Sequence, residues 1–135
     1  MATILAHIRV TEGSEERFEE VIRGLYDATH RTETGVRRYE YWRGSEPRSY
    51  YTLLSFDDFR GFIAHQVSDH HEAAAAQFRA MFESFRIEWC DPVDGASDLP
   101  PTESQDMAAD ADELTLNSAE RFAVRSADWW SRLRR

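Results

Sequence analysis

Apolar and polar residues alternate along four short stretches of the chain, and a period of two predicts β-strands. The first stretch runs from Thr3 to Val10, and its apolar face holds Ile4, Ala6, Ile8 and Val10. The other three cover Val36 to Arg43, Ser49 to Phe56 and Phe85 to Trp89. The link at residues 44–48, GSEPR, has the length and composition of a hairpin loop.

Between these strands, apolar residues recur every three or four positions and predict helices. The first helix begins after Ser14 as its N-cap and ends near Thr32. Its apolar stripe consists of Phe18, Val21, Ile22, Leu25 and Tyr26. Two short helices follow the third strand. The first has Asp57 or Asp58 as its N-cap and contains Phe59, Phe62 and Ile63. The second has Ser68 or Asp69 as its N-cap, and its buried stripe consists of Phe78, Met81 and Phe82.

The predicted order is β-α-β-β-α-β with a broken second helix, which indicates an α+β, ferredoxin-like domain over residues 1–91. Such a domain has a four-stranded antiparallel sheet with helices on one face only. We expect large side chains on the uncovered face, namely Tyr39, Tyr41, Tyr51 and Leu53. An apolar face of that size favours a partner, so the pattern predicts a homodimer.

The remaining residues differ in composition from this domain. Residues 92–116 form an expected acidic linker, and from Asp91 to Leu116 there are eight acidic residues and no basic one. Residues 117–135 predict one C-terminal amphipathic helix with a charge of +3, starting at Asn117 and Glu120 as a capping box. Its apolar face holds Ala119, Phe122, Trp129, Trp130 and Leu133. We expect this helix to dock on its own domain or on the dimer partner.

Composition and charge narrow the function classes. The formal net charge of -9 argues against nucleic-acid binding, which needs clustered cations. All 16 basic residues are arginine, so chemistry that needs a lysine amine is excluded. The N-terminus shows no signal-peptide pattern, no apolar run is long enough for a membrane span, and Cys90 is the single cysteine. We therefore expect a cytoplasmic protein that binds neither nucleic acid nor membrane.

The strongest candidate for chemistry is the segment His65-Gln66-Val67-Ser68-Asp69-His70-His71-Glu72, at the break between the two short helices. A break there lets His65 and His70 point into one cavity. There is no HExxH motif, and five residues is the wrong spacing for two ligands on one helix face, so we expect no metal site. Imidazole titrates near neutral pH and can remove a proton from a phenol or enol. Histidines that merely cap a helix are the simpler interpretation.

Aromatic side chains around this segment predict an apolar pocket for a flat ligand. The candidate substrate-binding residues are Tyr39, Trp42, Tyr51, Phe62, His71 and Phe78. Rings at helical spacing are also typical of an ordinary core.

Residues 1–90 resemble the antibiotic biosynthesis monooxygenase (ABM) and quinol monooxygenase family of dimeric α/β barrels. The segments that carry the resemblance are ILAHIRVTEG, GVRRYEYWRG, YYTLLSFDD and above all FIAHQVSDHH. The resemblance implies oxidation of electron-rich phenols, quinols or anthrones with O₂ and without metal, flavin or other cofactor. In such a reaction His65 or His70 would be the base or the oxyanion partner, and Tyr39, Trp42 and Tyr51 would line the cavity.

The chain departs from the related haem-degrading branch, which has Asn, Trp and His where this sequence has Ala6, His65 and Ala75, so we do not expect haem degradation. Two other functions fit the same scaffold. One is an isomerase, cyclase or dehydratase that uses the histidine base without O₂. The other is a non-enzymatic dimer that binds a ligand. The arginine-rich and alanine-rich composition is typical of a bacterial genome of high GC content.

Overall fold

The computed structural model describes all 135 residues of the chain. Its elements are β1 (Ala2–Val10), α1 (Glu15–Thr32), β2 (Val36–Arg43), β3 (Ser49–Phe56), α2 (Phe59–Gln66), α3 (Asp69–Met81), β4 (Phe82–Trp89), α4 (Glu113–Arg121) and α5 (Asp128–Leu133). The predicted α+β, ferredoxin-like order is confirmed. The last strand starts three residues earlier than predicted, because Phe82 has extended backbone and ends α3 instead of continuing its apolar stripe.

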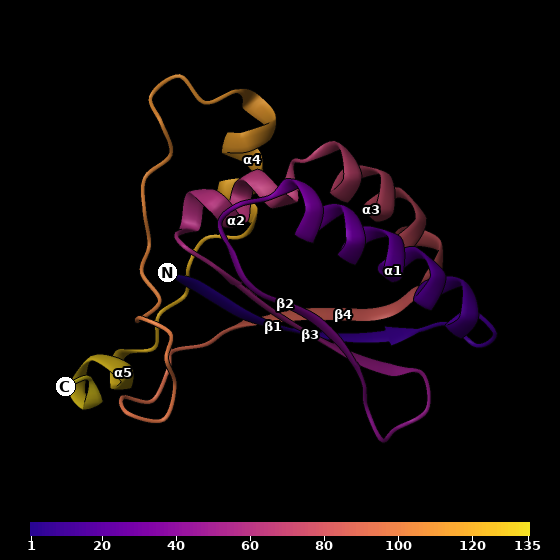
Figure 1. The fold of residues 1–135 in the computed structure, drawn as a ribbon, viewed down its shortest axis with the longest axis horizontal. Coiled ribbons are helices and arrows are strands. Elements are labelled where there is room, and N and C mark those ends of the chain that lie inside the picture. Colours follow the sequence, from indigo (N-terminus) through magenta and orange to yellow (C-terminus); the bar gives the residue numbers. More distant parts are fainter.

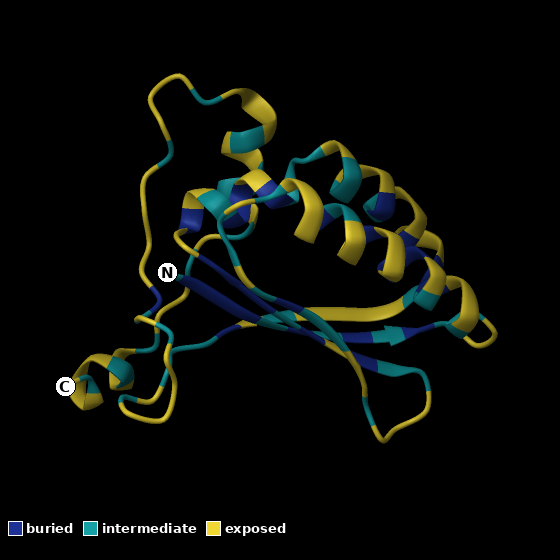
Figure 2. Cartoon of the chain, viewed as in Figure 1, coloured by how far each residue is buried: buried dark blue, intermediate teal, exposed yellow.

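The four strands form one open antiparallel sheet in the order β2-β3-β1-β4. Helices α1 and α3 lie side by side on one face of this sheet and run in opposite directions (Figure 1). The end of α1 therefore lies near the start of α3 and the break after α2. Buried residues concentrate on the sheet and on the inner sides of these helices (Figure 2).

Local chemistry accounts for the helix boundaries. The carboxylate of Asp58 accepts a hydrogen bond from the Gly61 backbone N–H at the start of α2, and the Ser68 hydroxyl accepts one from the His71 N–H at the start of α3. Ser14 does precede α1, but its hydroxyl pairs with that of Thr11 at 2.7 Å and does not cap the helix.

The register between β2 and β3 corrects the expected distribution of aromatic residues. Tyr39 pairs with Leu54 and Tyr41 with Thr52, so an odd-numbered residue of β2 lies beside an even-numbered residue of β3. Neighbouring partners share a face, so Tyr39 and Tyr41 face the helices. The prediction that both would lie on the uncovered face with Tyr51 was wrong, because it assumed that odd positions in the two strands match.

The C-terminal segment returns along the domain instead of leaving it. Thr102 is 1% exposed, its hydroxyl donates to the Cys90 carbonyl at 2.6 Å, and it accepts from the Thr3 N–H at 3.3 Å. The guanidinium of Arg134 then binds both carboxylate oxygens of Asp91, at 2.7 and 2.8 Å. The acidic segment is thereby held against β1 and β4.

The single helix predicted for residues 117–135 is wrong, since two helices occupy this region, separated at residues 122–127. Asp112 caps α4 by accepting from the Thr115 N–H at 2.8 Å, so Asn117 lies inside the helix. Within the break, the Trp89 indole donates to the Ala123 carbonyl at 3.1 Å. Helix α4 packs on α2 (Figure 1). No helix in the chain combines the length and the apolar character that a membrane crossing requires.

Candidate active site

A cavity of about 420 Å³ lies between the sheet and the helices, a volume typical of small-molecule sites. All four strands contribute to it, together with α2, α3 and α4. Of its 23 lining residues 14 are hydrophobic, and the others are polar or charged. The predicted site residues among its lining are Tyr39, Phe62, His65, His71 and Phe78.

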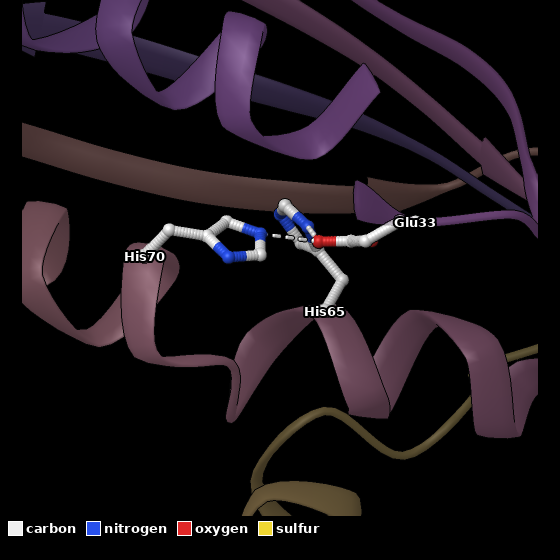
Figure 3. A group of neighbouring side chains, drawn as sticks. All are labelled: Glu33, His65 and His70. Carbon is white, nitrogen blue, oxygen red and sulfur yellow. Dashed lines mark hydrogen bonds and ion pairs between the residues drawn. The ribbon is translucent and has the colours of Figure 1, made fainter. Parts of the chain in front are cut away.

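His65 is the central polar side chain of this cavity. It lies in the last turn of α2 and is 1% exposed, with the rings of Tyr39 and Phe56 at 4.9 and 5.2 Å between centroids. Its Nδ1 atom lies 2.9 Å from Oε1 of Glu33, the residue that ends α1 (Figure 3). Its Nε2 atom is buried and has no hydrogen-bond partner in the protein.

Glu33 determines which nitrogen of His65 carries the proton. Burial by itself would raise the pKa of Glu33, but the hydrogen bonds and charges of His65 and His70 outweigh burial and hold the pKa below its usual value. An ionised carboxylate only accepts hydrogen bonds, so Nδ1 of His65 donates. In the neutral ring, Nε2 then keeps its lone pair. A buried imidazole with a free lone pair beside a cavity is the arrangement of a general base.

The other two histidines of the segment have different surroundings. Nε2 of His70 lies 2.6 Å from the same Glu33 oxygen (Figure 3). His70 is not among the residues that line the cavity. His71 does line the cavity, with its ring 4.8 Å from that of His65 and its Nδ1 atom buried without a partner. Burial, helped by the neighbouring His65, lowers the pKa of His71 to about 4, so this side chain is neutral at pH 7.

Two tyrosines supply hydroxyl groups on the sheet side of the cavity. The Tyr39 and Tyr41 oxygens lie 2.9 Å apart, and both residues line the cavity. Burial raises the pKa of Tyr41 to about 12 and that of Tyr39 well above its usual value. Both hydroxyls therefore stay protonated. One of them donates to the other, so one hydroxyl proton of the pair is left to donate to an oxyanion.

Glu33, His65 and His70 could also bind a metal ion. Each offers one ligand atom, and these three atoms lie within 4.8 Å of one another. The sequence spacing had led us to expect no such group, because it could not foresee that Glu33 joins the two histidines. Two imidazoles and a carboxylate suit several divalent metals. A metal-bound histidine usually donates its second N–H to an acceptor, and Nε2 of His65 has none. The surroundings of His65 fit a base facing a ligand better than a metal ligand.

Comparison with known proteins identifies the family. The family described as antibiotic biosynthesis monooxygenase matches residues 1–77, more than half of the chain. The chain belongs to this family. No functionally curated protein matches it.

Solved structures agree with this assignment. A Caulobacter crescentus protein, provisionally named an antibiotic biosynthesis monooxygenase, is 25% identical with a TM-score of 0.64, and the match covers 69% of this chain and 90% of that one. A Shewanella oneidensis protein is 27% identical with a TM-score of 0.61, covering 66% and 87%. A Pseudomonas aeruginosa protein at 22% identity and a TM-score of 0.60, covering 66% and 90%, shares the fold.

The structure separates the remaining predicted site residues from the cavity of this ABM-family chain. Trp42 and Tyr51 are 59% and 39% exposed and pair with each other on the face of the sheet that no helix covers. The prediction that they line the cavity was wrong. Each is the neighbour in sequence of a cavity-lining residue, Tyr41 or Thr52, and successive residues of a strand point to opposite faces of the sheet. His70 contacts Glu33 from outside the cavity.

Sequence reasoning missed two contributors to the site. Glu33 lies 32 residues before His65, and only the antiparallel packing of α1 and α3 brings it to the break between α2 and α3. The βαββαβ order predicts this antiparallel packing, and it is the one feature of the sequence that could have directed attention to Glu33 at the end of α1. The second contributor is α4, which lies beyond the 77 residues that match the family.

Proposed function

We propose that this chain is a cofactor-independent monooxygenase that oxidises an electron-rich aromatic compound (a quinol, an anthrone or a polyketide-like phenol) with O₂. The observation that carries the proposal is the Glu33–His65 pair, which leaves Nε2 of a cavity-lining histidine without a hydrogen-bond partner. Membership of the ABM family supports the same reaction class.

In the proposed reaction, Nε2 of His65 takes a proton from the O–H or activated C–H of the substrate. The ionised aromatic passes one electron to O₂, and the radical pair combines into a peroxide. For an anthrone-type CH₂ group, loss of water from the peroxide leaves a carbonyl. One oxygen atom enters the product and the other leaves as water with the two substrate hydrogens, so no external reductant is needed.

The residues around His65 suit these steps. Glu33 stabilises the imidazolium that forms when Nε2 takes the proton. The Tyr39–Tyr41 hydroxyl pair lines the cavity and has one proton left to donate to a phenolate or enolate oxygen. Apolar walls limit water, which would otherwise protonate the carbanion.

Oxygen uptake with a panel of anthrones and naphthoquinols tests the proposal, combined with mass spectrometry under ¹⁸O₂. We expect uptake with the appearance of one labelled oxygen atom in the product, and loss of both in His65→Ala. Glu16→Gln is the control, because Glu16 is exposed on α1 and does not line the cavity. Turnover under strict anaerobiosis would contradict the monooxygenase and favour an isomerase, cyclase or dehydratase with the same base. Binding without turnover would favour a ligand-binding protein.

We also propose that the chain forms a homodimer through the uncovered face of the sheet. Trp42, Tyr51, Leu5 and Leu53 are wholly or partly exposed on this face. Such apolar area favours a partner, and pairing two copies would bury it on both. Light scattering after gel filtration should give about twice the chain mass of 15.7 kDa, and a monomer mass would contradict the dimer.

A further inference from the structure

The C-terminal helix α4 completes the cavity. Its lining residues recur with the helical period, so one whole face of the helix is directed at the cavity: Leu114, Asn117, Ser118, Arg121 and Phe122. The position of this face is fixed at its end, where the Trp89 indole holds the Ala123 carbonyl and the Phe122 ring packs against Phe62 at 5.9 Å. Helix α4 lies outside residues 1–77, which match the family, so its contribution comes from the C-terminal extension.

Two arginines line the cavity, and neither has an acidic partner. Arg121 comes from the last turn of α4 and Arg79 from the last turn of α3, and no ion pair or hydrogen bond is made by either side chain. The Arg121 guanidinium lies over the Phe122 ring, 4.9 Å from its centroid, which orients it beside the apolar wall. The one carboxylate among the lining residues, Glu72, pairs with neither, and Arg79, Arg121 and Glu72 are all exposed.

We propose that the substrate carries a carboxylate, which Arg121 and Arg79 bind while the ionisable aromatic group faces His65. This inference rests on the proposed function and names a class of substrate for the same cavity. A guanidinium binds a carboxylate through two parallel N–H donors, which fixes orientation as well as position. In a protein with a net charge of -9, two arginines against the single carboxylate of Glu72 give the cavity lining an excess of positive charge, which favours an anion there. Arg121 is thus a specificity-determining residue supplied by the extension.

Isothermal titration tests this with two probes of one shape, 1-hydroxy-2-naphthoate and its neutral carboxamide. We expect the full-length protein to bind the carboxylate at least about tenfold more tightly than the carboxamide. Arg121→Ala and the milder Arg121→Gln should lose most of this preference, and Arg79→Ala part of it. Raising the salt from about 50 mM to about 500 mM should weaken binding of the carboxylate alone.

Matched controls remove the same charge from places outside the cavity. Arg125 lies just past α4 and Arg31 lies in the last turn of α1, and neither lines the cavity. Arg125→Ala and Arg31→Ala should keep the preference. Equal affinity of the wild type for both probes, or equal losses in Arg125→Ala and Arg121→Ala, would overturn the inference.

The binding experiment is independent of turnover. A carboxylate preference that disappears in Arg121→Ala, in a protein that consumes no oxygen, would support this inference and contradict the proposed monooxygenase. Oxygen uptake that is equally fast with carboxylated and neutral substrates would overturn this inference and leave the monooxygenase intact.

Discussion

Oε1 of Glu33 lies 2.9 Å from Nδ1 of His65 and 2.6 Å from Nε2 of His70, so one carboxylate oxygen joins the end of α1 to both sides of the break between α2 and α3. The two histidines are not equivalent in this arrangement. His65 lines the cavity and its second nitrogen has no hydrogen-bond partner, whereas His70 does not line the cavity.

Replacing Glu33 by Gln should lower kcat by about 10²- to 10⁴-fold. The amide lacks the charge that stabilises the imidazolium, and its NH₂ group can force the proton onto Nε2 of His65. Oxygen uptake measures the effect, with Glu16→Gln as a control because Glu16 is exposed on the outer side of α1. Unchanged turnover in Glu33→Gln would show that the pair has no part in the reaction.

Replacing His70 by Gln should reduce turnover less than about tenfold, whereas His65→Gln should abolish it. The reason is that Glu33 keeps its bond to His65 when His70 is lost. Parallel kinetics on the two variants are the measurement. If His70→Gln were the more damaging change, the base would have to be reassigned.

His71 should make the free energy of unfolding depend on pH above the range in which carboxylates titrate. The unfolded chain binds a proton on His71 near pH 6.5, but the folded protein does so only near pH 4. Stability is therefore full above pH 6.5 and falls as the pH drops toward 4. Urea unfolding should show that the wild type loses about 1 to 2 kcal/mol more than His71→Asn between about pH 7 and about pH 5. Parallel pH profiles for the two proteins would refute this effect.

Removing the Arg134 side chain should destabilise the folded C-terminal extension. Asp91, whose side chain is 7% exposed, would be left with an unpaired charge, at a cost of about 1 to 3 kcal/mol. The measurement is the free energy of unfolding of Arg134→Ala, compared with Arg132→Ala, which removes an exposed arginine that has no ion pair. Equal stabilities of the two variants would mean that the Arg134–Asp91 contact does not hold α5.

Periodicity along the chain was sufficient to predict the βαββαβ order, because each strand and helix of the domain buries one face and so carries a regular pattern. Periodicity could not show which residues of β2 and which residues of β3 lie on the same face of the sheet. The side of the sheet on which Tyr39 and Tyr51 lie depends on the pairing of β2 with β3, which alternation within one strand does not contain.

The sequence predicted the site residues that lie close together in the chain. It did not predict those that come from distant segments. His65, His70 and His71 form one visible segment, and their distinct roles depend on which nitrogen meets Glu33. The C-terminal extension was misjudged for a related reason. A helix was expected at Asn117, but Asp112 caps it earlier, and it is interrupted at residues 122–127, where Trp89 contacts Ala123.

The central claim is that Nε2 of His65 removes a proton from the substrate, and stopped-flow absorbance without oxygen tests it most directly. Mixing an anthrone with the anaerobic wild type should produce the spectrum of the deprotonated substrate, which decays when O₂ is admitted. His65→Ala should produce no such spectrum, and Glu16→Gln should behave as the wild type. Formation of the deprotonated substrate by His65→Ala at the wild-type rate would contradict the claim.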